Sequence, residues 1–427
     1  MRPLARTPKR GAPRNSPLAS LSWDDIVARH PSLALEPSPL MTLADHSTPA
    51  LVVDAQRLNR NIKRMQSLAD EQNVTLRPHI KTHKSVAIAE QQREAGARGI
   101  TVATVREAEI FAEAGFNDIR IAYAVVGRDK HERVLQLMDS VEISFCVDTA
   151  AGMKQAATFY ERNGHSANVL MEVDVGHGRC GVAWDGDAAI DLARLITKQK
   201  GLQLRGILTH AGQAYHGPAA HETAEAALRR CATAERDRML TLANRLREAG
   251  IAEASPGEFA ISIGSTPTMA AFENTSDAGF SITEIRPGNY VFYDATQVSL
   301  RAAALDDCAL TVLATVISRK TENQQTRLYV DAGKKVITSD TGHLTKGYGL
   351  LLRDVQSRKP AARAEVVALS EEHGWLRVNG DAPFAVGDRV QLIPNHACVT
   401  MGTQDRYVLL SPNGTTSTHP VDARAHG

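Results

Sequence analysis

Hydrophobic and polar positions along residues 50–295 alternate between two periods. Short runs rich in β-branched residues predict strands, and the segments between them carry apolar residues at i, i+3, i+4 and i+7, which predicts amphipathic helices. The predicted strands cover 51–54, 75–80, 99–105, 119–125, 142–148, 168–175, 204–211, 259–264 and 284–293. Because the strands are almost continuously apolar and alternate with helices, we expect a parallel sheet covered by helices on both faces.

Eight of these strands remain when the first is set aside, and eight strands with intervening helices close a (β/α)8 barrel. An open doubly wound sheet is the alternative that this pattern leaves. We therefore predict an α/β fold with a barrel domain over residues 48–298. In such barrels the chemistry lies where the strands end and the following loops begin.

The pattern changes near residue 300. Residues 299–427 hold short strands separated by Gly, Asn, Asp and Pro, which is typical of an all-β domain. The first 21 residues differ again, with five Arg or Lys and no acid, and they lack the apolar core of a secretory signal. We expect residues 1–40 to be a disordered basic extension, an organelle transit peptide, or a segment upstream of a true start at Met41.

Composition limits the function. Hydrophobic residues make up 43% and charged residues 23% of the 427 positions, which is normal for a soluble globular protein. The net charge of +1 provides no basic field for nucleic acid or an anionic membrane, and no apolar run approaches the roughly 20 residues that span a bilayer. The five cysteines are sparse, so we expect free thiols in the cytoplasm, four of them acting as small apolar side chains.

The densest group of polar residues at a predicted strand end is Arg77-Pro-His79-Ile-Lys81-Thr-His-Lys. A lysine held half out of water at a barrel strand end has a lowered pKa, and its neutral amine is then nucleophilic enough to form a Schiff base. Taken alone, three basic groups in a loop are more typical of a solvated surface.

A second group follows the predicted strand 259–264. Gly264, Ser265 and Thr266 place a glycine and two hydroxyls one strand before the last, where barrels bind phosphate with backbone N–H groups and hydroxyls. An ordinary capped turn has the same composition. A phosphate site on the rim that carries an activated lysine is what pyridoxal 5'-phosphate requires, so we predict this cofactor.

Two further loops bring candidates to the same rim. Arg179 lies in a Gly-rich loop after one strand and would neutralise the cofactor phenolate or a substrate carboxylate. A loop arginine that only pairs with a neighbouring acid is the alternative. His210, Gln213 and Tyr215 lie at the end of the next strand and just beyond it.

A candidate metal site consists of His396 and Cys398. In an extended strand residues i and i+2 face the same side, so both side chains would reach one ion. An imidazole with a thiolate suits Zn²⁺ better than Mg²⁺ or Ca²⁺, and two protein ligands leave positions open for water and substrate. We expect Zn²⁺, with Mn²⁺ as the alternative, although the pair by itself is a weak signal.

These stretches occur together, and in this order, in one family. The chain from about 48 to 405 resembles the fold-type III pyridoxal-phosphate enzymes that comprise D-threonine aldolases and D-serine dehydratases. The matching stretches are TPALVVDAQRLNRNIKRM, LRPHIKTHK, EVDVGHGRCGV, ILTHAGQAYHG, SIGSTPT, EIRPGNYVFYD, VDAG, LSEEHG and LIPNHACVT. The resemblance implies an alanine-racemase-like barrel followed by a C-terminal β domain.

The resemblance also implies roles for individual residues. Lys81 would carry the cofactor as a Schiff base and act as general base, while the metal would polarise the substrate's 3-hydroxyl. The residues implied at the cofactor phosphate are Gly264, Ser265, Thr266 and Tyr290. Arg179 and Tyr215 are implied near the rest of the cofactor, where we also expect His210, and the implied metal ligands are His396 and Cys398.

The metal pair further indicates the reaction. Aldolase-type members carry His-Cys-Asp and dehydratase-type members His-x-Cys, so this chain resembles the dehydratases. We predict a lyase that dehydrates a small D-3-hydroxy amino acid (D-serine, D-threonine or D-threo-3-hydroxyaspartate) to a 2-oxo acid and ammonia. Retro-aldol cleavage to glycine and an aldehyde is the first alternative, and a racemase or a non-catalytic pyridoxal-phosphate-binding protein follows. The family suggests that two subunits associate.

Overall fold

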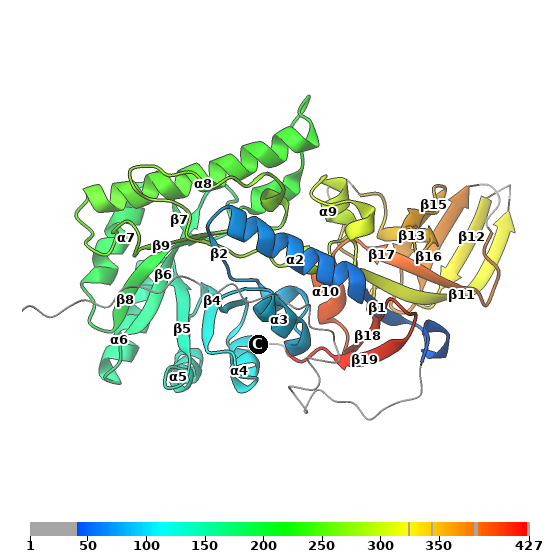
Figure 1. The fold of residues 1–427 in the computed structure, drawn as a ribbon, viewed down its shortest axis with the longest axis horizontal. Coiled ribbons are helices and arrows are strands. Elements are labelled where there is room, and N and C mark those ends of the chain that lie inside the picture. The colour runs from blue at the N-terminus through cyan, green and yellow to red at the C-terminus, as the bar shows by residue number, and fades with distance from the viewer. Residues whose placement is uncertain (1–40, 323–324, 343–344, 380–382, 425–427) are drawn as a thin grey trace, which may run out of the picture. The chain divides into compact units, whose positions relative to one another are not determined.

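The computed structural model describes residues 41–322, 325–342, 345–379 and 383–424. The predictions for the extension 1–40 therefore lie outside the described residues. The strands of the described residues form two sheets, one parallel and one mainly antiparallel (Figure 1).

The first sheet is the predicted (β/α)8 barrel. Its eight main strands within the described residues are β2 (Thr75–Leu76), β3 (Ile100–Val102), β4 (Asp118–Ala124), β5 (Glu142–Val147), β6 (Ala167–Asp174), β8 (Leu202–Thr209), β9 (Ala260–Ile263) and β10 (Glu284–Ile285). They pair in the order β2-β10-β9-β8-β6-β5-β4-β3, and the short β7 (Val182–Ala183) joins β6. A parallel bridge between His79 and Thr101 connects the two ends of this order. The ring of strands is thereby closed, as predicted.

Helices surround the barrel on the outside (Figure 1). They are α2 (Ala55–Glu71), α3 (Val86–Glu94), α4 (Val105–Glu113), α5 (Arg128–Leu137), α6 (Ala150–Arg162), α7 (Asp187–Thr197) and α8 (Ala224–Glu248). In α2 the Asp54 carboxylate accepts the Arg57 N–H and caps the helix start. The buried apolar stripe of α2 is Leu58, Ile62, Met65 and Ala69, a helical spacing that turns one face toward the barrel.

The second sheet contains the C-terminal strands and also β1 (Ala50–Asp54). The main order is β14 (Lys359–Pro360), β13 (Gly349–Asp354), β17 (Arg389–Pro394), β11 (Leu310–Glu322), β1, β18 (Arg406–Leu410) and β19 (Thr416–Pro420). A branch from β11 adds β12 (Gln325–Val330), β16 (Gly374–Asn379) and β15 (Ala364–Leu369). Because β1 pairs with β11 and β18, the strand that was set aside in counting the barrel belongs to this sheet.

Two barrel strands are shorter than the periodicity predicts. In the runs 75–80 and 284–293 the strands cover only 75–76 and 284–285, with one further bridge at His79, and 3-10 turns follow at Ile80–Thr82 and Asn289–Val291. A proline in each run lacks the N–H that a ladder needs. The two segments also approach closely, because a Cβ on Gly288 would lie 2.7 Å from the His79 carbonyl oxygen. This crowding bends both chains away from the sheet and places Lys81 at the rim.

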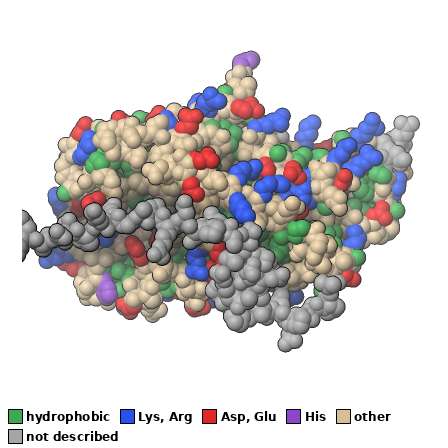
Figure 2. All heavy atoms as spheres, in the orientation of Figure 1, with side chains coloured by type: hydrophobic (Ala, Val, Ile, Leu, Met, Phe, Trp, Pro, Cys, Tyr) green, Lys and Arg blue, Asp and Glu red, His purple; other side chains and the backbone are tan. Residues whose placement is uncertain are grey.

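The surface is charged without being dominated by one sign. On the face drawn in Figure 2, basic and acidic side chains of the described residues are interspersed, which agrees with the net charge of +1. Among the described residues, no helix has both the length and the apolar character needed to cross a bilayer.

Candidate active site

One cavity of about 530 Å³ lies at the carboxyl ends of the barrel strands, a volume within the range of small-molecule sites. It brings together most of the residues predicted from the sequence. Those that line it are Lys81, Arg179, His210, Tyr215, Gly264, Ser265, Thr266, His396 and Cys398. Tyr290 and Gln213 are not among the lining residues.

Lys81 lies in the 3-10 helix Ile80–Thr82 directly after β2. Burial lowers the pKa of its ammonium group below the ordinary value of 10.5; Cys398 offsets part of this effect and Arg179 adds to it. A larger share of the side chain is therefore a neutral amine near physiological pH. That is the form that attacks a carbonyl carbon.

The loop that begins at Gly264 has the features of an anion site. Gly264 has φ +138°, and a Cβ there would lie 2.6 Å from the backbone N of Arg286, so only glycine fits. Its N–H donates to Glu235 Oε1 over 3.0 Å, and the Thr268 hydroxyl donates to Glu235 Oε2 over 2.9 Å. The Thr266 hydroxyl oxygen is buried and has no hydrogen-bond partner among the described residues. It is therefore available to a ligand such as a phosphate oxygen.

Glu235 was missed by sequence reasoning. It lies in the middle of α8 and is fully buried, and it also accepts the Ala211 N–H over 3.3 Å. The carboxylate thus connects the loop after β8 with the loop after β9. A glutamate within a long amphipathic helix gives no signal of this contact in the sequence.

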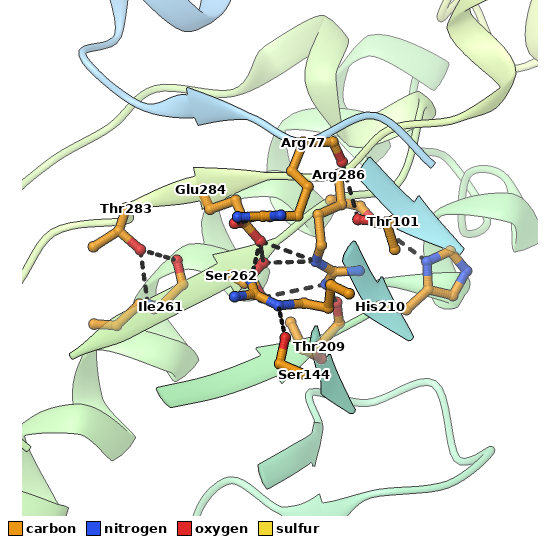
Figure 3. A network of polar contacts seen from close by, with 12 residues as sticks. Arg77, Thr101, Ser144, Thr209, His210, Ile261, Ser262, Thr283, Glu284 and Arg286 are labelled. Atoms are coloured by element: carbon orange, nitrogen blue, oxygen red, sulfur yellow. Dashed lines mark hydrogen bonds and ion pairs between the residues drawn. The ribbon is translucent and has the colours of Figure 1, made fainter. Parts of the chain in front are cut away.

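Arg286 also lines the cavity and was not predicted. Its Nε donates to the Ser262 hydroxyl over 2.6 Å, and its Nη2 donates to the Thr209 carbonyl (Figure 3). Nη1 makes no hydrogen bond within the described residues, so one N–H edge is available to a ligand. The charge stays in place because the guanidinium is held by two neighbouring strands.

A buried carboxylate organises the arginines below the cavity. Glu284 accepts hydrogen bonds from Arg77 Nε over 2.6 Å and from Ser262 Oγ over 2.5 Å (Figure 3), and it pairs with Arg120. Burial raises the pKa of Glu284, but Arg120 and Arg77 lower it more, to about 2. Glu284 lies in β10 and Arg286 directly follows that strand; their i, i+2 spacing in the run 284–293 was the signal that both side chains point into the barrel.

Two histidines that line the cavity, the buried His79 and the half-buried His210, are neutral. Burial, followed by the positive charge of Lys81, lowers the pKa of His79 and of His210 well below 6.5. His210 Nδ1 lies 3.3 Å from the Gly264 carbonyl oxygen, which can only accept. The proton of the neutral ring is therefore on Nδ1, and Nε2 is left as an acceptor.

The Gly-rich loop after β6 brings Arg179 to the rim. Asp174 Oδ1 accepts the N–H groups of residues 176–178 over 2.8, 2.8 and 3.1 Å and so shapes the loop. Arg179 is 52% exposed and its Nη2 lies 3.7 Å from Glu172 Oε1. The Cys180 thiol donates to the same carboxylate over 3.0 Å. Cys180 is exposed and lines the cavity, so the prediction that it is an apolar filler is wrong.

The metal pair has a different local structure from the one predicted. Strand β17 ends at Pro394, and His396 is the N-cap of α10 (Ala397–Gly402), which contains Cys398. The expectation that both residues lie in an extended strand is therefore wrong. Helix α10 begins here because the Asp294 carboxylate accepts the Ala397 N–H over 3.0 Å, a contact that local sequence does not reveal. The two side chains still interact with each other.

The environment of the pair fits a metal. Asp340 Oδ2 lies 2.5 Å from His396 Nδ1, which leaves Nε2 for an ion, the arrangement typical of zinc-bound histidine. Burial lowers the pKa of His396, but Cys398, Asp294 and Asp340 raise it more, to about 10, so a metal that binds Nε2 would displace a proton from the ring. In the described part of the chain no group of three or more His, Cys, Asp or Glu is arranged to hold an ion. Two protein ligands would thus leave open positions.

A second cavity of about 430 Å³ adjoins the metal pair. It shares Tyr215, Asn289 and His396 with the first cavity. Burial raises the pKa of Tyr215 well above its ordinary value of 10.0, so its hydroxyl keeps its proton as a donor. The Asn289 Oδ1 atom is buried without a partner among the described residues. The metal pair therefore borders a polar space with room for substrate or water.

Tyr290 lies behind the segment 80–84, called here the lysine loop. Its hydroxyl accepts a hydrogen bond from Gln92 Nε2 over 2.9 Å, and Gln92 Oε1 accepts one from His83 Nε2 over 3.1 Å. Gln213 donates to the Val175 carbonyl over 3.1 Å. Both residues therefore support the loops of the site, and the structure does not bring them to the cavity.

Comparison with known proteins identifies two matching domains. Residues 53–296 match the family described as alanine racemase, N-terminal domain, and residues 309–410 match the putative serine dehydratase domain. The chain is 36% identical to D-threo-3-hydroxyaspartate dehydratase of Delftia sp. (strain HT23), over 90% of this chain and 99% of the relative. It is 34% identical to D-threonine aldolase of Arthrobacter sp., over 90% of this chain and 94% of that relative.

A solved structure agrees with these relatives. A cysteine-to-alanine mutant of D-threo-3-hydroxyaspartate dehydratase, in the metal-free form, superposes with a TM-score of 0.80 at 36% identity. The match covers 91% of this chain and all of the solved chain. With an alanine-racemase-like barrel followed by a serine dehydratase domain, the chain belongs to the family of pyridoxal-phosphate enzymes that includes the D-serine and D-threo-3-hydroxyaspartate dehydratases and D-threonine aldolase.

Proposed function

We propose that this protein is a pyridoxal-phosphate- and metal-dependent lyase that converts a D-3-hydroxy amino acid into a 2-oxo acid and ammonia. The observation that carries the proposal is a single cavity lined by Lys81 and by the His396–Cys398 pair. A half-buried lysine supplies a neutral amine for the cofactor aldehyde, and an imidazole with a thiolate supplies a metal site beside it. The similar proteins named D-threo-3-hydroxyaspartate dehydratase, D-serine dehydratase and D-threonine aldolase support a D-3-hydroxy amino acid as the substrate class.

The lining residues fit the cofactor. The unpartnered Thr266 hydroxyl and the tight turn at Gly264 suit a phosphate, and Lys81 would form the covalent bond. Arg179 and the free edge of Arg286 would meet the oxygen and nitrogen atoms of the ring. When bound, pyridoxal phosphate would withdraw electrons from the substrate Cα.

His396 and Cys398 would hold the metal, and we propose Zn²⁺ because imidazole and thiolate are its preferred ligands. A metal there would act as a Lewis acid on the 3-hydroxyl of the substrate. Asp340 would keep the imidazole in the correct orientation. A related dehydratase has been solved as a cysteine-to-alanine mutant in the metal-free form, which supports a metal as part of such a site.

Lys81 is the proposed base. Once the substrate amine has replaced it at the cofactor, its neutral Nζ would accept the proton from Cα. The 3-hydroxyl leaves, so proton and hydroxyl together account for the water that is lost. Hydrolysis of the remaining unsaturated amine gives the 2-oxo acid and ammonia. His79 and His210 stay neutral beside Lys81. They therefore add no positive charge that would oppose protonation of Lys81 Nζ.

Retro-aldol cleavage is the second candidate, and the 34% identity with D-threonine aldolase favours it. In that reaction the 3-hydroxyl would lose its proton and the Cα–Cβ bond would break, giving glycine and an aldehyde. The same lysine, phosphate loop and metal pair would serve both reactions. Products therefore distinguish the candidates better than residues do.

A product assay tests the proposal. Purified, cofactor-loaded protein is incubated with D-serine, D-threonine and D-threo-3-hydroxyaspartate, with and without added Zn²⁺ or Mn²⁺. Metal-dependent 2-oxo acid, formed in step with ammonia, is the expected result and identifies the substrate. Glycine together with an aldehyde would assign the protein to the aldolases. If cofactor-loaded protein forms neither set of products, both proposed reactions are overturned.

A pair of cysteine variants tests the metal. Cys398→Ala is expected to lose 2-oxo acid formation, because one of the two protein ligands is gone. Cys180→Ala is the matched control, since Cys180 lines the same cavity but contacts Glu172; its metal dependence should equal that of the wild type. Full activity of Cys398→Ala in the presence of a chelator would remove the metal from the scheme.

A further inference from the structure

We propose that residues 421–423, called here the C-terminal clamp, position Lys81 for its bond to the cofactor aldehyde. This inference rests on the proposed function of Lys81. The clamp follows β19 and lies beyond the matched serine dehydratase domain, which ends at residue 410. Figure 1 shows the chain running from β19 toward α3.

The clamp makes three hydrogen bonds to Lys84 and Val86, which lie between Lys81 and the first turn of α3. The Ala423 N–H donates to the Lys84 carbonyl over 2.9 Å, and the Lys84 ammonium donates to the Ala423 carbonyl over 3.4 Å. The Val86 N–H donates to Asp422 Oδ2 over 2.8 Å. Val421 and Ala423 are 4% and 0% exposed. The clamp is therefore packed against the segment it contacts.

Asp422 supplies the cap that helix α3 lacks locally. Ser85 is the N-cap of α3, but its side chain makes no capping hydrogen bond. Its hydroxyl contacts the Tyr407 hydroxyl of β18 over 3.1 Å. The first N–H groups of a helix need an acceptor, and a negative charge at this end is favoured by the helix dipole. A carboxylate 336 residues away in the chain fills this role.

The lysine loop depends on such support because one of its residues is strained. Lys84 has φ +51°, a left-handed conformation that residues other than glycine rarely adopt. Its carbonyl accepts from the clamp, and its own N–H donates to the Ile80 carbonyl over 2.8 Å. Ile80 begins the 3-10 helix that carries Lys81. Release of the clamp would thus loosen the turn that fixes the lysine backbone.

The position of Lys81 matters most for formation of the covalent bond. Nζ attacks the aldehyde carbon, a C=N bond replaces C=O, and the oxygen leaves as water. This requires Nζ to lie within about 3–3.5 Å of the carbon and in line with its orbital. The phosphate site at Gly264 and Thr266 belongs to other strands. The clamp should therefore affect bond formation more strongly than occupancy of the cavity.

Two cofactor forms separate these effects in the full-length protein. Pyridoxine 5'-phosphate has an alcohol in place of the aldehyde, so it occupies the cavity without bonding to Lys81. Asp422→Ala should weaken pyridoxal phosphate binding, measured from the Schiff-base absorbance, about tenfold, which corresponds to one lost helix cap. Its affinity for pyridoxine 5'-phosphate should equal that of the wild type. Asp422→Asn keeps an acceptor for the Val86 N–H and should bind both forms normally.

Thr149→Ala is the matched control, because Thr149 caps α6 by accepting the Gly152 N–H and does not line the cavity. It should bind both forms as the wild type does. Equal weakening of both forms by Asp422→Ala, or no weakening of either, would overturn the clamp. Borohydride reduction and peptide mapping identify the bonded lysine. Trapping at a residue other than Lys81 in the wild type would overturn the proposed function of Lys81 together with the clamp.

Discussion

The Thr82 Oγ1 atom lies 3.2 Å from Cys398 Sγ, although the two residues are 316 positions apart in the chain. Thr82 directly follows Lys81, so this contact joins the lysine loop to the metal pair. Burial raises the pKa of Cys398, but His396 and then Thr82 lower it more, to below the ordinary 9.0. The lysine loop therefore helps to keep the thiol in the form that binds a metal.

Replacement of Thr82 by Val should weaken metal binding about tenfold. Val has the same shape, but it removes a hydrogen bond to a charged sulfur and leaves the thiolate without that donor. Competition with a chromogenic chelator measures the metal dissociation constant. Thr82→Ser keeps the hydroxyl and should remain close to the wild type. Equal metal affinities of the Val and Ser variants would show that the contact contributes nothing to the metal site.

The residues that could be predicted from the sequence are those at predicted strand ends whose roles a family resemblance also implied; position alone left each of them open. Lys81 and the loop 264–266 follow barrel strands, and a loop at a strand end is where this fold gathers its functional groups. His396 and Cys398 were predicted from their side-chain chemistry, a weak signal alone, together with the family resemblance, and both line the cavity. The predicted strand there was wrong because a distant carboxylate starts α10.

The residues that were missed act through distant contacts. Glu235 contacts Gly264 across 29 positions, and Asp340 contacts His396 across 56. Neither carboxylate belongs to a motif, and a charged residue in a helix or loop is usually solvated. The family resemblance implied Tyr290 at the phosphate, but its hydroxyl accepts a hydrogen bond from Gln92 and it does not line the cavity. Position along the chain does not determine the direction of a side chain where a strand gives way to a 3-10 turn.

Substitution of Gly264 by Ala should both destabilise the protein and weaken cofactor binding. A Cβ would lie 2.6 Å from the Arg286 backbone N, at φ +138°, and such a strained backbone costs roughly 1–3 kcal/mol. Urea unfolding measures the first effect and pyridoxal phosphate titration the second. Gly257→Ala is the control, because Gly257 also has a positive φ (+87°) but no atom within 4 Å of the added Cβ. Unchanged cofactor affinity in the Gly264 variant would contradict the phosphate-loop assignment.

Glu284→Gln should lower the free energy of unfolding at neutral pH by about 3 kcal/mol, because Arg77 and Arg120 lose their buried counter-charge. The folded-state pKa of Glu284, about 2, lies below the ordinary 4.5. Its contribution is therefore fully present above about pH 4.5 and is lost as pH falls toward 2. The difference in the free energy of unfolding between wild type and Glu284→Gln should therefore shrink as pH falls from 4.5 toward 2. Urea unfolding at several pH values measures this.

Glu222→Gln provides the comparison for this pH effect. Glu222 pairs with Arg230 near the surface over 2.8 Å, and solvent screens such pairs, so the loss of stability should be smaller. A Glu284 variant as stable as the Glu222 variant at pH 7 would mean that Arg77 and Arg120 do not need the buried carboxylate. If the difference in unfolding free energy between wild type and Glu284→Gln stays constant below pH 4.5, the low pKa of Glu284 is contradicted.

Lys81→Met should abolish the Schiff-base absorbance and yet stabilise the cofactor-free protein at pH 7. Burial lowers the folded-state pKa of Lys81 below 10.5, so between the two pKa values the unfolded chain holds more protons than the folded one. The free energy of unfolding of the wild type then rises with pH through that window. Below it, the buried charge destabilises the fold, and Met removes this penalty.

The gain in unfolding free energy from Lys81→Met should therefore decrease as pH rises toward 10.5. Near that pH the wild-type amine loses its charge in the unfolded chain as well as in the folded one. Urea unfolding of cofactor-free proteins between pH 7 and 10.5 measures this. Lys154→Met, at an exposed position of α6, should show no such trend. A Lys81 variant that is less stable than the wild type at pH 7 would mean that the ammonium is well solvated or paired in the folded protein. The amine would then not be held ready for the cofactor, and the reason for assigning the Schiff base to this residue would be lost.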